Sequence, residues 1–555
     1  MNVAPGLNAK GQGWLRHLWR KATTEDDWSM EGEPHPWWDR YSLPPMLSFA
    51  RFDLSESSYG LLIMARKTPA WREVYERILD ELIRRHTTYW AAIDWLTQIG
   101  PDPDRERYPK AYRRLIPKHM WGRYDVPGWV ANGIEPWPLA PDPINADGNL
   151  FFRGFFNLLL AIHKDVTGSD KWERPFAMAG LDDRTFEWTH SGINSFLGDQ
   201  WARVWHGPHC ENTKVWPFCL SAAGLGLQLS DNTLGSSGHW VFDRWTDDFL
   251  KKKCMGYDRR GNLKWVGLYY DPLIDFVQGQ SALSGLFPAF YVLPQNRPLA
   301  EEMYRKAVAA IGWDKGWLPM LAPNMPRPLT LAYLLAREFG DQTTMRRVSG
   351  ALAKFSNGRF FDGGGEGDLD EFGYFFRFGE QFPRGQESAL LMLADVMDAG
   401  EWFDAFKPRD RSWHTAPTVE GVAYPDLGVS VANNDAQTGV LHVCTYAATT
   451  SRRGDETKFR ITQLPDAGQI AVLRDGVTYG AWRAVSDHEI EISTVIGPHR
   501  YEIHTGYRDA GAQASEAELE HMPPQSASRR ITSPIEIVSA TRAVADGVAS
   551  CPCCA

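Results

Sequence analysis

The residue types best suited to chemistry lie in one short segment, residues 209–219, which reads HCENTKVWPFC. Two thiols nine residues apart, Cys210 and Cys219, flank the carboxyl group of Glu211 and two aromatic side chains. Pro217 fits the first turn of a helix, where its missing N–H costs nothing, so we expect Cys219 near a helix N-terminus and Cys210 in the loop before it. The positive end of the helix dipole favours a thiolate, and apolar surroundings favour a protonated carboxyl group. The segment therefore predicts a thiol base beside a carboxylic acid; the alternative is that the thiols only fill space in the core.

A second group of polar residues lies in the segment RFDLSESSYG, with Asp53, Glu56 and Tyr59. Asp53 is a candidate proton donor. The alternative is a capping segment, because Ser and Asp runs ahead of an apolar helix satisfy the free N–H groups of its first turn. Tyr269, in the segment YYDP, is a candidate for lining a substrate cavity.

Other clusters of reactive side chains have spacings that predict no function. The carboxylates of residues 360–373 fit no standard calcium loop, and Cys551, Cys553 and Cys554 are typical of a dispensable tail. The P-loop, HExxH, nucleophile-elbow and EF-hand patterns are missing from the sequence. We therefore predict no cofactor and no metal, and expect acid–base or thiol chemistry.

The composition of the chain argues against several classes of binding partner. The formal net charge is −10 and no basic block occurs, which argues against binding nucleic acid or an anionic membrane surface. The longest apolar stretch, residues 150–162, is shorter than the roughly 20 residues that span a bilayer. The sequence shows no secretory signal, and its seven cysteines are few and odd in number, so we expect a cytoplasmic protein with reduced thiols.

The elements that must position these residues change in character near residue 412. Before this point, apolar residues recur at helical spacing, most clearly in residues 71–89. The same recurrence appears in residues 149–166, 186–202, 217–231, 240–252, 300–312, 329–339 and 386–399. A long series of paired amphipathic helices with little alternating pattern predicts an all-α toroid or solenoid.

After residue 412 the hydrophobic period becomes two, which predicts a small antiparallel β domain. Asp475-Gly476 is a strong signal for a type I′ hairpin within it. We therefore expect three parts: a helical domain with an N-terminal arm over residues 1–412, a β domain over 413–510, and a partly ordered tail over 511–555.

Three segments, which occur in the same order along the chain as in that family, resemble the linalool dehydratase-isomerase family. They are CENTKVWPFC (residues 210–219), DPINADGNLFFRGFFNLLLAIHKDVTGSDKWE (residues 142–173) and LLAREFGD (residues 334–341). The resemblance extends over about residues 50–410. It implies an (α/α)6 barrel and a cofactor-independent enzyme that removes or adds water at a tertiary allylic alcohol and isomerises it. It also implies a site near a subunit boundary, and hence a homo-oligomer.

The resemblance transfers to individual residues only in part. Cys210, Glu211 and Cys219 are retained, whereas the family's catalytic histidine falls on Phe155. A neighbouring methionine falls on Phe151 and a pocket tyrosine on Phe52. The family's upstream Asp and Tyr have plausible but differently spaced counterparts in Asp39 and Tyr41. These replacements, together with Trp216 beside the thiols, favour a large apolar substrate.

The residues and the resemblance together predict a dehydratase or hydratase-isomerase that acts on an apolar, terpenoid-like alcohol or alkene. Two alternatives stay open. A carbohydrate-active (α/α)6-barrel enzyme would use the tryptophans for sugar stacking and carboxylate pairs such as Glu366 and Asp368 or Asp370 and Glu371 for acid–base work. A catalytically inactive protein that binds an apolar ligand would explain the loss of the histidine at Phe155.

Overall fold

The computed structural model describes ten stretches of the chain. They are residues 6–23, 50–87, 141–146, 149–180, 184–210, 214–272, 275–313, 327–359, 373–376 and 385–508. The side chains of residues 50–53, 353–359, 373–376 and 385–387 are not part of this description. All the described residues lie in one compact unit, Met1–Arg508.

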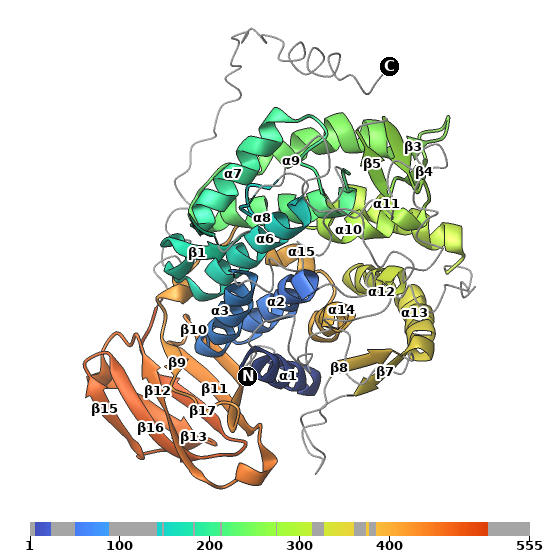
Figure 1. Cartoon of the computed structure of the whole chain (residues 1–555). Helices are drawn as coiled ribbons and strands as arrows, with labels where there is room; N and C mark the ends of the chain where they lie inside the picture. The colour runs from blue at the N-terminus through green and yellow to red at the C-terminus, as the bar shows by residue number, and fades with distance from the viewer. Residues whose placement is uncertain are drawn as a thin grey trace, which may run out of the picture. The chain divides into compact units, whose positions relative to one another are not determined.

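Six helices contact one another in succession around the helical region (Figure 1). They are α2 (Ala50–Lys67), α6 (Leu150–Thr167), α8 (Pro217–Leu234), α10 (Leu286–Val292), α12 (Arg327–Glu338) and α14 (Gly385–Val396). Helix α14 contacts α2 again, so the series of contacts returns to its start.

Further helices alternate with these six along the chain, and each of them packs against at least one of the six. They are α1 (Ala9–Thr23), α3 (Glu73–Thr87), α7 (His190–Arg203), α9 (Trp240–Trp245) with its π-helical continuation Thr246–Cys254, α11 (Arg297–Ile311) and α13 (Gln342–Phe355). The short α15 (Glu401–Ala405) packs against α2 and α12. The helices predicted from apolar periodicity are confirmed, with ends that differ by a few residues. Within the described residues, none of the helices combines the length and apolar composition needed to cross a bilayer.

Two features of the helical region differ from the prediction. The segment RFDLSESSYG lies inside α2, which begins at Ala50, and therefore does not form a cap before a helix. Its polar side chains from Ser55 to Ser58 are buried. Four short hairpins also interrupt the helices. They are β1 (Phe176–Ala179) with β2 (Thr185–Trp188), β3 (Met255–Tyr257) with β4 (Leu263–Val266), β5 (Tyr269–Asp271) with β6 (Phe276–Gln278), and β7 (Ser356–Arg359) with β8 (Gly373–Phe376). Strands of three or four residues are too short to produce a recognisable alternation.

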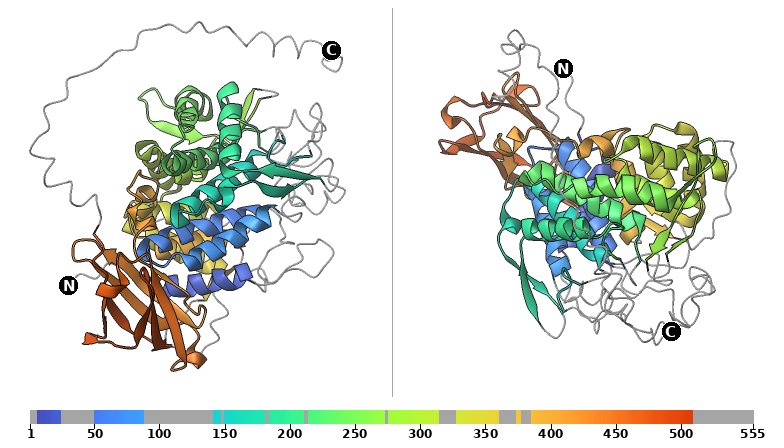
Figure 2. Two further views of the ribbon diagram at one scale, coloured as in Figure 1. Left: turned by 90° about the vertical axis from the view of Figure 1, so that its left-hand side faces the viewer. Right: turned by 90° about the horizontal axis from the view of Figure 1, so that it is seen from above.

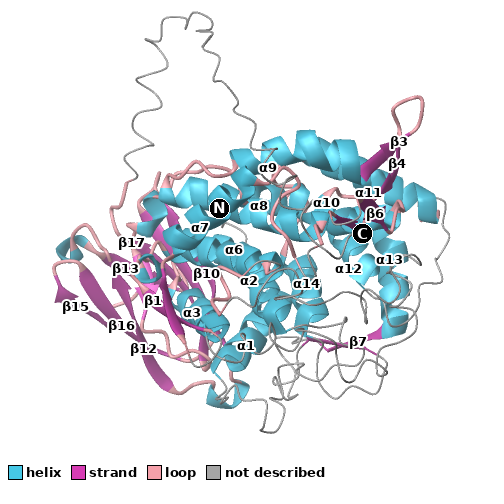
Figure 3. Cartoon of the chain, turned by 45° about the horizontal axis from the view of Figure 1, so that its top comes forward, coloured by secondary structure: helices cyan, strands magenta, loops and turns pink. Residues whose placement is uncertain are grey.

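The C-terminal β region is antiparallel, as predicted, and consists of two sheets (Figure 3). One sheet has the order β10 (Leu427–Asp435), β11 (Val440–Ala447), β17 (Arg500–His504), β13 (Ala471–Arg474), β14 (Val477–Thr478). The other has the order β15 (Trp482–Ser486), β16 (Glu489–Val495), β12 (Glu456–Thr462), β9 (Thr418–Glu420). Positive φ values at Asp475 (55°) and Gly476 (81°) between β13 and β14 confirm the predicted hairpin.

The two sheets bury their facing side chains against each other. Tyr501 of β17 lies with its ring 5.3 Å from Phe459 of β12, and its hydroxyl is 2.6 Å from that of Thr494 in β16. The inward positions of β12 and β16 are buried at every second residue. The period of two in the sequence therefore corresponds to one face turned to this core. Figure 2 shows the strands and the helices from two further sides.

Candidate functional site

The two thiols of the family segment are buried and lie in the predicted local structures. Cys210 is fully buried in the loop before α8, and its backbone N–H donates to the carbonyl oxygen of Lys214 at 2.7 Å. Cys219 is the third residue of α8, which begins at Pro217, and is 3% exposed. Neither forms a disulfide with another described cysteine. Cys219 is thus in the first turn of a helix, where the dipole favours an anion.

Helices α6 and α8 bring the thiol segment to the start of the phenylalanine-rich helix. A Cβ at Gly154 would lie 2.9 Å from Cβ of Ala223, and one at Gly226 would lie 3.1 Å from the backbone nitrogen of Leu158. A later residue of α6 thus contacts a later residue of α8. The two helices therefore run parallel, with their N-termini at the same end. The N–H of Leu150 also donates to the carbonyl oxygen of His209 at 3.1 Å. Cys210 and Cys219 therefore lie at the N-terminal end of this helix pair.

Phe155, the position that matches the family's histidine, lies in an aromatic cluster. Its ring is 5.5 Å from that of Phe218 and 5.7 Å from that of Tyr291, and Phe218 and Tyr291 are 5.3 Å apart. Phe155 is 1% exposed, and Phe151, one turn earlier in α6, is fully buried. Tyr291 supplies the phenol of this cluster. Phe218 directly precedes Cys219 in the sequence, so the cluster adjoins the thiol.

A buried ion pair lies beside this aromatic cluster. Glu56 of α2 has no exposed surface, and both of its carboxylate oxygens accept from the guanidinium group of Arg327, at 3.1 Å for Oε2 and at a shorter distance for Oε1. Tyr291 donates its hydroxyl to Oε1 at 3.0 Å, and Tyr59 donates to the hydroxyl of Tyr291 at 3.3 Å. The guanidinium carbon of Arg327 also lies 5.3 Å from the ring centre of Phe218. The elements α2, α8, α10 and α12 thus contribute to one connected group.

The two phenols of this group stay neutral. Burial raises the pKa of Tyr59 and of Tyr291 well above the usual value, and the negative charge of Glu56 raises both further. A phenol with a raised pKa is a poor proton donor but a good hydrogen-bonding partner for a neutral hydroxyl group. Tyr59 and Tyr291 therefore suit positioning of a ligand better than acid catalysis.

Arg327 and Tyr291 are absent from the residues predicted to form the site. Arg327 is the first residue of α12, where an arginine in the sequence looks like a solvated charge, and Tyr291 lies in the apolar run LFPAFYV. A tyrosine within a fully apolar helix is a weak signal that its hydroxyl has a buried partner. Glu56 and Tyr59 were recognisable in RFDLSESSYG, but only the tertiary structure pairs them.

Trp216 and Tyr269 lie together on the other side of the thiol segment. Their ring centres are 4.9 Å apart, and Tyr269 is 3% exposed. The neighbouring Lys214 and Asp271 form an ion pair at 2.8 Å in which both side chains are more than 90% buried. Burial lowers the pKa of Lys214, although Asp271 acts in the opposite direction. This ion pair holds the loop of Cys210 against β5.

Several predicted site residues cannot be placed relative to these groups. Asp39, Tyr41 and Glu211 lie outside the described residues. Phe52 and Asp53 lie in α2, but their side chains are outside the description. Their roles stay predictions, and so does the convergence of the thiols on one cavity.

Several polar residues of the long family segment, residues 142–173, have a structural role. Arg153, fully buried, donates to the carbonyl oxygens of Ile144 and Ala146 at 3.1 and 2.6 Å, and Asn149 donates to that of Pro143 at 2.5 Å. These bonds hold the loop before α6. Their function is therefore to position the start of this helix.

The described part of the chain also contains a group of potential metal ligands away from the thiols. The one described group of three His, Cys, Asp or Glu side chains with adjacent ligand atoms is Glu76, Asp80 and His163. Asp80 lies on α3, and His163 lies thirteen residues after the start of α6, which corresponds to roughly 20 Å along the helix. The site at the N-terminal end of α6 and α8 is thus separate from this group.

A model of one protein family matches part of the chain. Residues 117–366 match the model of the linalool dehydratase/isomerase family. The matched range includes Cys210, Cys219 and Phe155, but it is narrower than the range of about 50–410 that the motifs predicted. The match confirms the predicted resemblance and supports a distant member of this family of dehydratases and isomerases.

Solved structures resemble the chain only weakly. One is the crystal structure of a GH127 β-L-arabinofuranosidase from Geobacillus stearothermophilus T6, with 9% identity, 89% of this chain and 75% of that chain covered, and a TM-score of 0.27. A second GH127 β-arabinofuranosidase has 10% identity, coverage of 89% and 74%, and a TM-score of 0.23. Scores this low support no conclusion about fold or function.

Proposed function

We propose that the protein is a cofactor-independent dehydratase or hydratase-isomerase that acts on an apolar tertiary or allylic alcohol, or on the corresponding alkene. The observation that carries this proposal is the pair of buried thiols, Cys210 and Cys219, at the common N-terminal end of α6 and α8. The family match over residues 117–366 contains both thiols. We also propose an (α/α)6 barrel, supported by the closed series of contacts from α2 through α14.

The reaction requires one proton donor and one proton acceptor. In the dehydration direction, the donor protonates the hydroxyl group as the C–O bond breaks, and water leaves. A thiolate at Cys210 or Cys219 removes a proton from the adjacent carbon, and the C–H electron pair forms the new double bond. Glu211, Asp53 or the second thiol supplies the proton, because Glu56 is paired with Arg327 and the phenols of Tyr59 and Tyr291 are weak acids.

The aromatic cluster would act on the substrate in two ways. The rings of Phe155 and Phe218 exclude water from an apolar chain, and an aromatic face stabilises developing positive charge by about 0.5–2 kcal/mol. One face of Phe218 is already near the guanidinium group of Arg327. Phe155 is therefore the better candidate for contact with the cationic carbon.

The test uses hydration of an acyclic monoterpene alkene in D₂O, with the product analysed by mass spectrometry. We expect carbon-bound deuterium in the alcohol, because the thiol that protonates the alkene has exchanged with solvent. Cys210→Ala or Cys219→Ala should lower kcat by roughly 10²–10⁴-fold, the usual contribution of acid–base catalysis.

Cys254→Ala is the matched control, since Cys254 is also a buried free thiol and burial raises its pKa to about 12. It should retain full activity. Full activity in both Cys210→Ala and Cys219→Ala, or an alcohol without carbon-bound deuterium, would refute the thiol mechanism. The carboxylates of the carbohydrate-active alternative, at residues 366–371, lie outside the described residues, so this alternative stays a prediction.

A further inference from the structure

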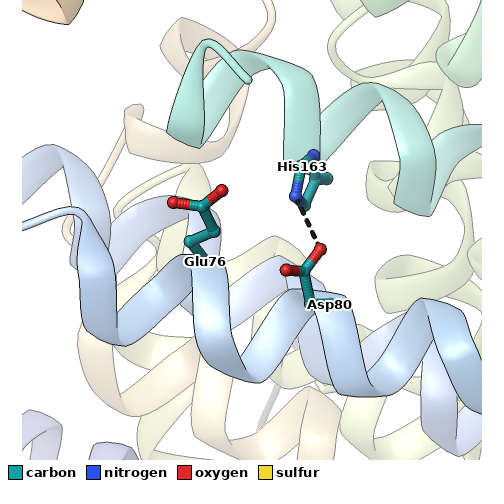
Figure 4. A group of neighbouring side chains, drawn as sticks. All are labelled: Glu76, Asp80 and His163. Carbon is teal, nitrogen blue, oxygen red and sulfur yellow. Dashed lines mark ion pairs between the residues drawn. The ribbon is translucent and has the colours of Figure 1, made fainter. Parts of the chain in front are cut away.

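Two helices outside the thiol site present a set of metal-ligand atoms to one another (Figure 4). Glu76 and Asp80 are four residues apart on α3 and therefore project from the same face of that helix. His163 extends toward them from α6. One ligand atom from each of the three side chains lies within 4.8 Å of the others.

We propose that Glu76, Asp80 and His163 bind a divalent transition-metal ion, with one imidazole nitrogen and two carboxylate oxygens as ligands. Imidazole and carboxylate together suit ions such as Zn²⁺ and Mn²⁺. The ligand set leaves at least one position for water.

His163 is the ligand whose environment points most directly to an ion. Its side chain is 1% exposed, and Nε2 is buried without a hydrogen bond. Nε2 lies 3.1 Å from Oδ1 of Asp80, but the two atoms lack the alignment that a hydrogen bond requires. The Asp80 carboxylate is thus the group that faces this nitrogen, and an ion between the imidazole and the carboxylates would bind both in place of this single contact.

Asp80 is held in place by its neighbours, as a metal ligand usually is. Oδ1 accepts from the indole N–H of Trp172 at 2.9 Å, and Oδ2 lies 2.7 Å from Nζ of Lys171. The side chain of Lys171 is 53% exposed, so the ammonium group can leave toward solvent. Lys171 thus supplies a positive charge where the ion would supply one.

Glu76 can complete the site at little cost. Two ligand atoms at the usual 2.0–2.2 Å from one ion lie roughly 3.4–4.2 Å apart, so a separation of up to 4.8 Å requires a small movement. Glu76 is half-buried, and its carboxylate has no hydrogen bond or ion pair with the described residues. It can therefore rotate toward the ion without breaking a hydrogen bond or an ion pair there.

The experiment titrates the metal-free full-length protein with Mn²⁺ and measures the free ion by electron paramagnetic resonance. Mn²⁺ is chosen because thiolates bind it poorly, so the cysteines do not compete. We expect one ion per chain. Glu76→Gln should weaken binding at least tenfold, while Glu302→Gln, which removes a partly exposed carboxylate on α11, should leave it unchanged.

Lys171→Ala separates a metal site from a purely structural ion pair. If the ammonium group competes with the ion, its removal should tighten Mn²⁺ binding several-fold and increase the rise in Tm on adding Mn²⁺. Absence of binding to the wild-type chain, equal affinity in Glu76→Gln and Glu302→Gln, or no gain in Lys171→Ala would each overturn the proposal. Circular dichroism of the variants shows that they are folded.

Discussion

At the scale of single residues, the ion pair of Glu56 and Arg327 places two buried charges beside the aromatic cluster. Among the described residues, its carboxylate accepts two hydrogen bonds from the guanidinium group and one from Tyr291. Taking both charges out of water costs several kcal/mol per ion, and the pair compensates only while it is complete. Its geometry therefore fixes the relative positions of α2, α10 and α12.

Glu56→Gln should lower the free energy of unfolding by about 3–5 kcal/mol, because it removes one charge of a buried ion pair and keeps the other. Tyr291→Phe should cost less, about 1–3 kcal/mol, since it removes the hydrogen bonds to Glu56 and from Tyr59 but leaves the ion pair complete. Urea unfolding measures both. Glu301→Gln, which breaks the exposed pair with Arg305, serves as the control and should change stability by under about 1 kcal/mol. Equal effects of the three substitutions would show that the buried pair is not a structural element.

A second residue-scale prediction concerns acid. Burial lowers the pKa of His17 to about 3, and the charges of Lys21 and Arg20 act in the same direction. Unfolded histidine titrates near its ordinary pKa of 6.5, so between about pH 6.5 and 3 the unfolded state binds more protons. Stability is therefore present above pH 6.5 and falls as the pH decreases, by about 1.4 kcal/mol per pH unit for such a group.

His17→Phe removes this proton uptake and preserves an aromatic ring beside Trp14. Unfolding by urea at a series of pH values should show a shallower loss of stability below pH 6.5 than in the wild type. An unchanged slope would mean that His17 does not contribute.

At the scale of elements, the close contact between α6 and α8 brings the thiol segment and the phenylalanine-rich helix together. Gly154 has its neighbour Ala223 too near for a side chain, whereas a Cβ at Gly198 in α7 would meet no atom within 4 Å. The two glycines are both inside helices. They differ in what surrounds them.

Gly154→Val should therefore lower the free energy of unfolding by about 1–3 kcal/mol through overpacking. Gly198→Val, at an open position, should change it by no more than about 0.5 kcal/mol. The measurement is chemical denaturation of both variants. A similar change in the two would indicate that α6 and α8 are further apart than the structure places them.

The predictability of each element follows from the length of its pattern. Helices α3, α7 and α8 have enough turns for apolar spacing to be recognised. The hairpin of β5 and β6, which carries Tyr269, has strands of three residues and depends on backbone pairing with the loop of Cys210, through Val215 and Tyr270. Such pairing has no signature in the order of residue types.

At the scale of the whole molecule, the described helical region and the β region share backbone hydrogen bonds. The N–H of Val419 donates to the carbonyl oxygen of Ala70 at 2.6 Å, and Glu73 accepts from the N–H groups of Gly421 and Val422 at 2.8 and 2.9 Å. Arg72 donates to the carbonyl oxygen of Trp413 at 2.7 Å. The predicted boundary near residue 412 therefore lies between regions that are bonded together.

Arg72→Ala should lower Tm while leaving a single calorimetric transition, because both regions depend on the same contacts. Limited proteolysis should then release fragments of both regions at the same temperature. Separate melting of the β region, with the transition of the helices unchanged, would show that the parts fold independently and that the contacts of Arg72 and Glu73 do not couple them.

The sequence by itself determined the helical and β regions, the Asp475-Gly476 hairpin, the placement of Cys219 at a helix start with Cys210 in the loop before it, and the resemblance to the dehydratase-isomerase family. These are local properties, because apolar periodicity, turn chemistry and residue spacing act within a few turns of chain. The pairing of Glu56 with Arg327, 271 residues away, and of Glu76 and Asp80 with His163 was decided only by the tertiary structure. Such contacts depend on which helix faces pack together. The residue type alone does not show whether a charge is buried or solvated.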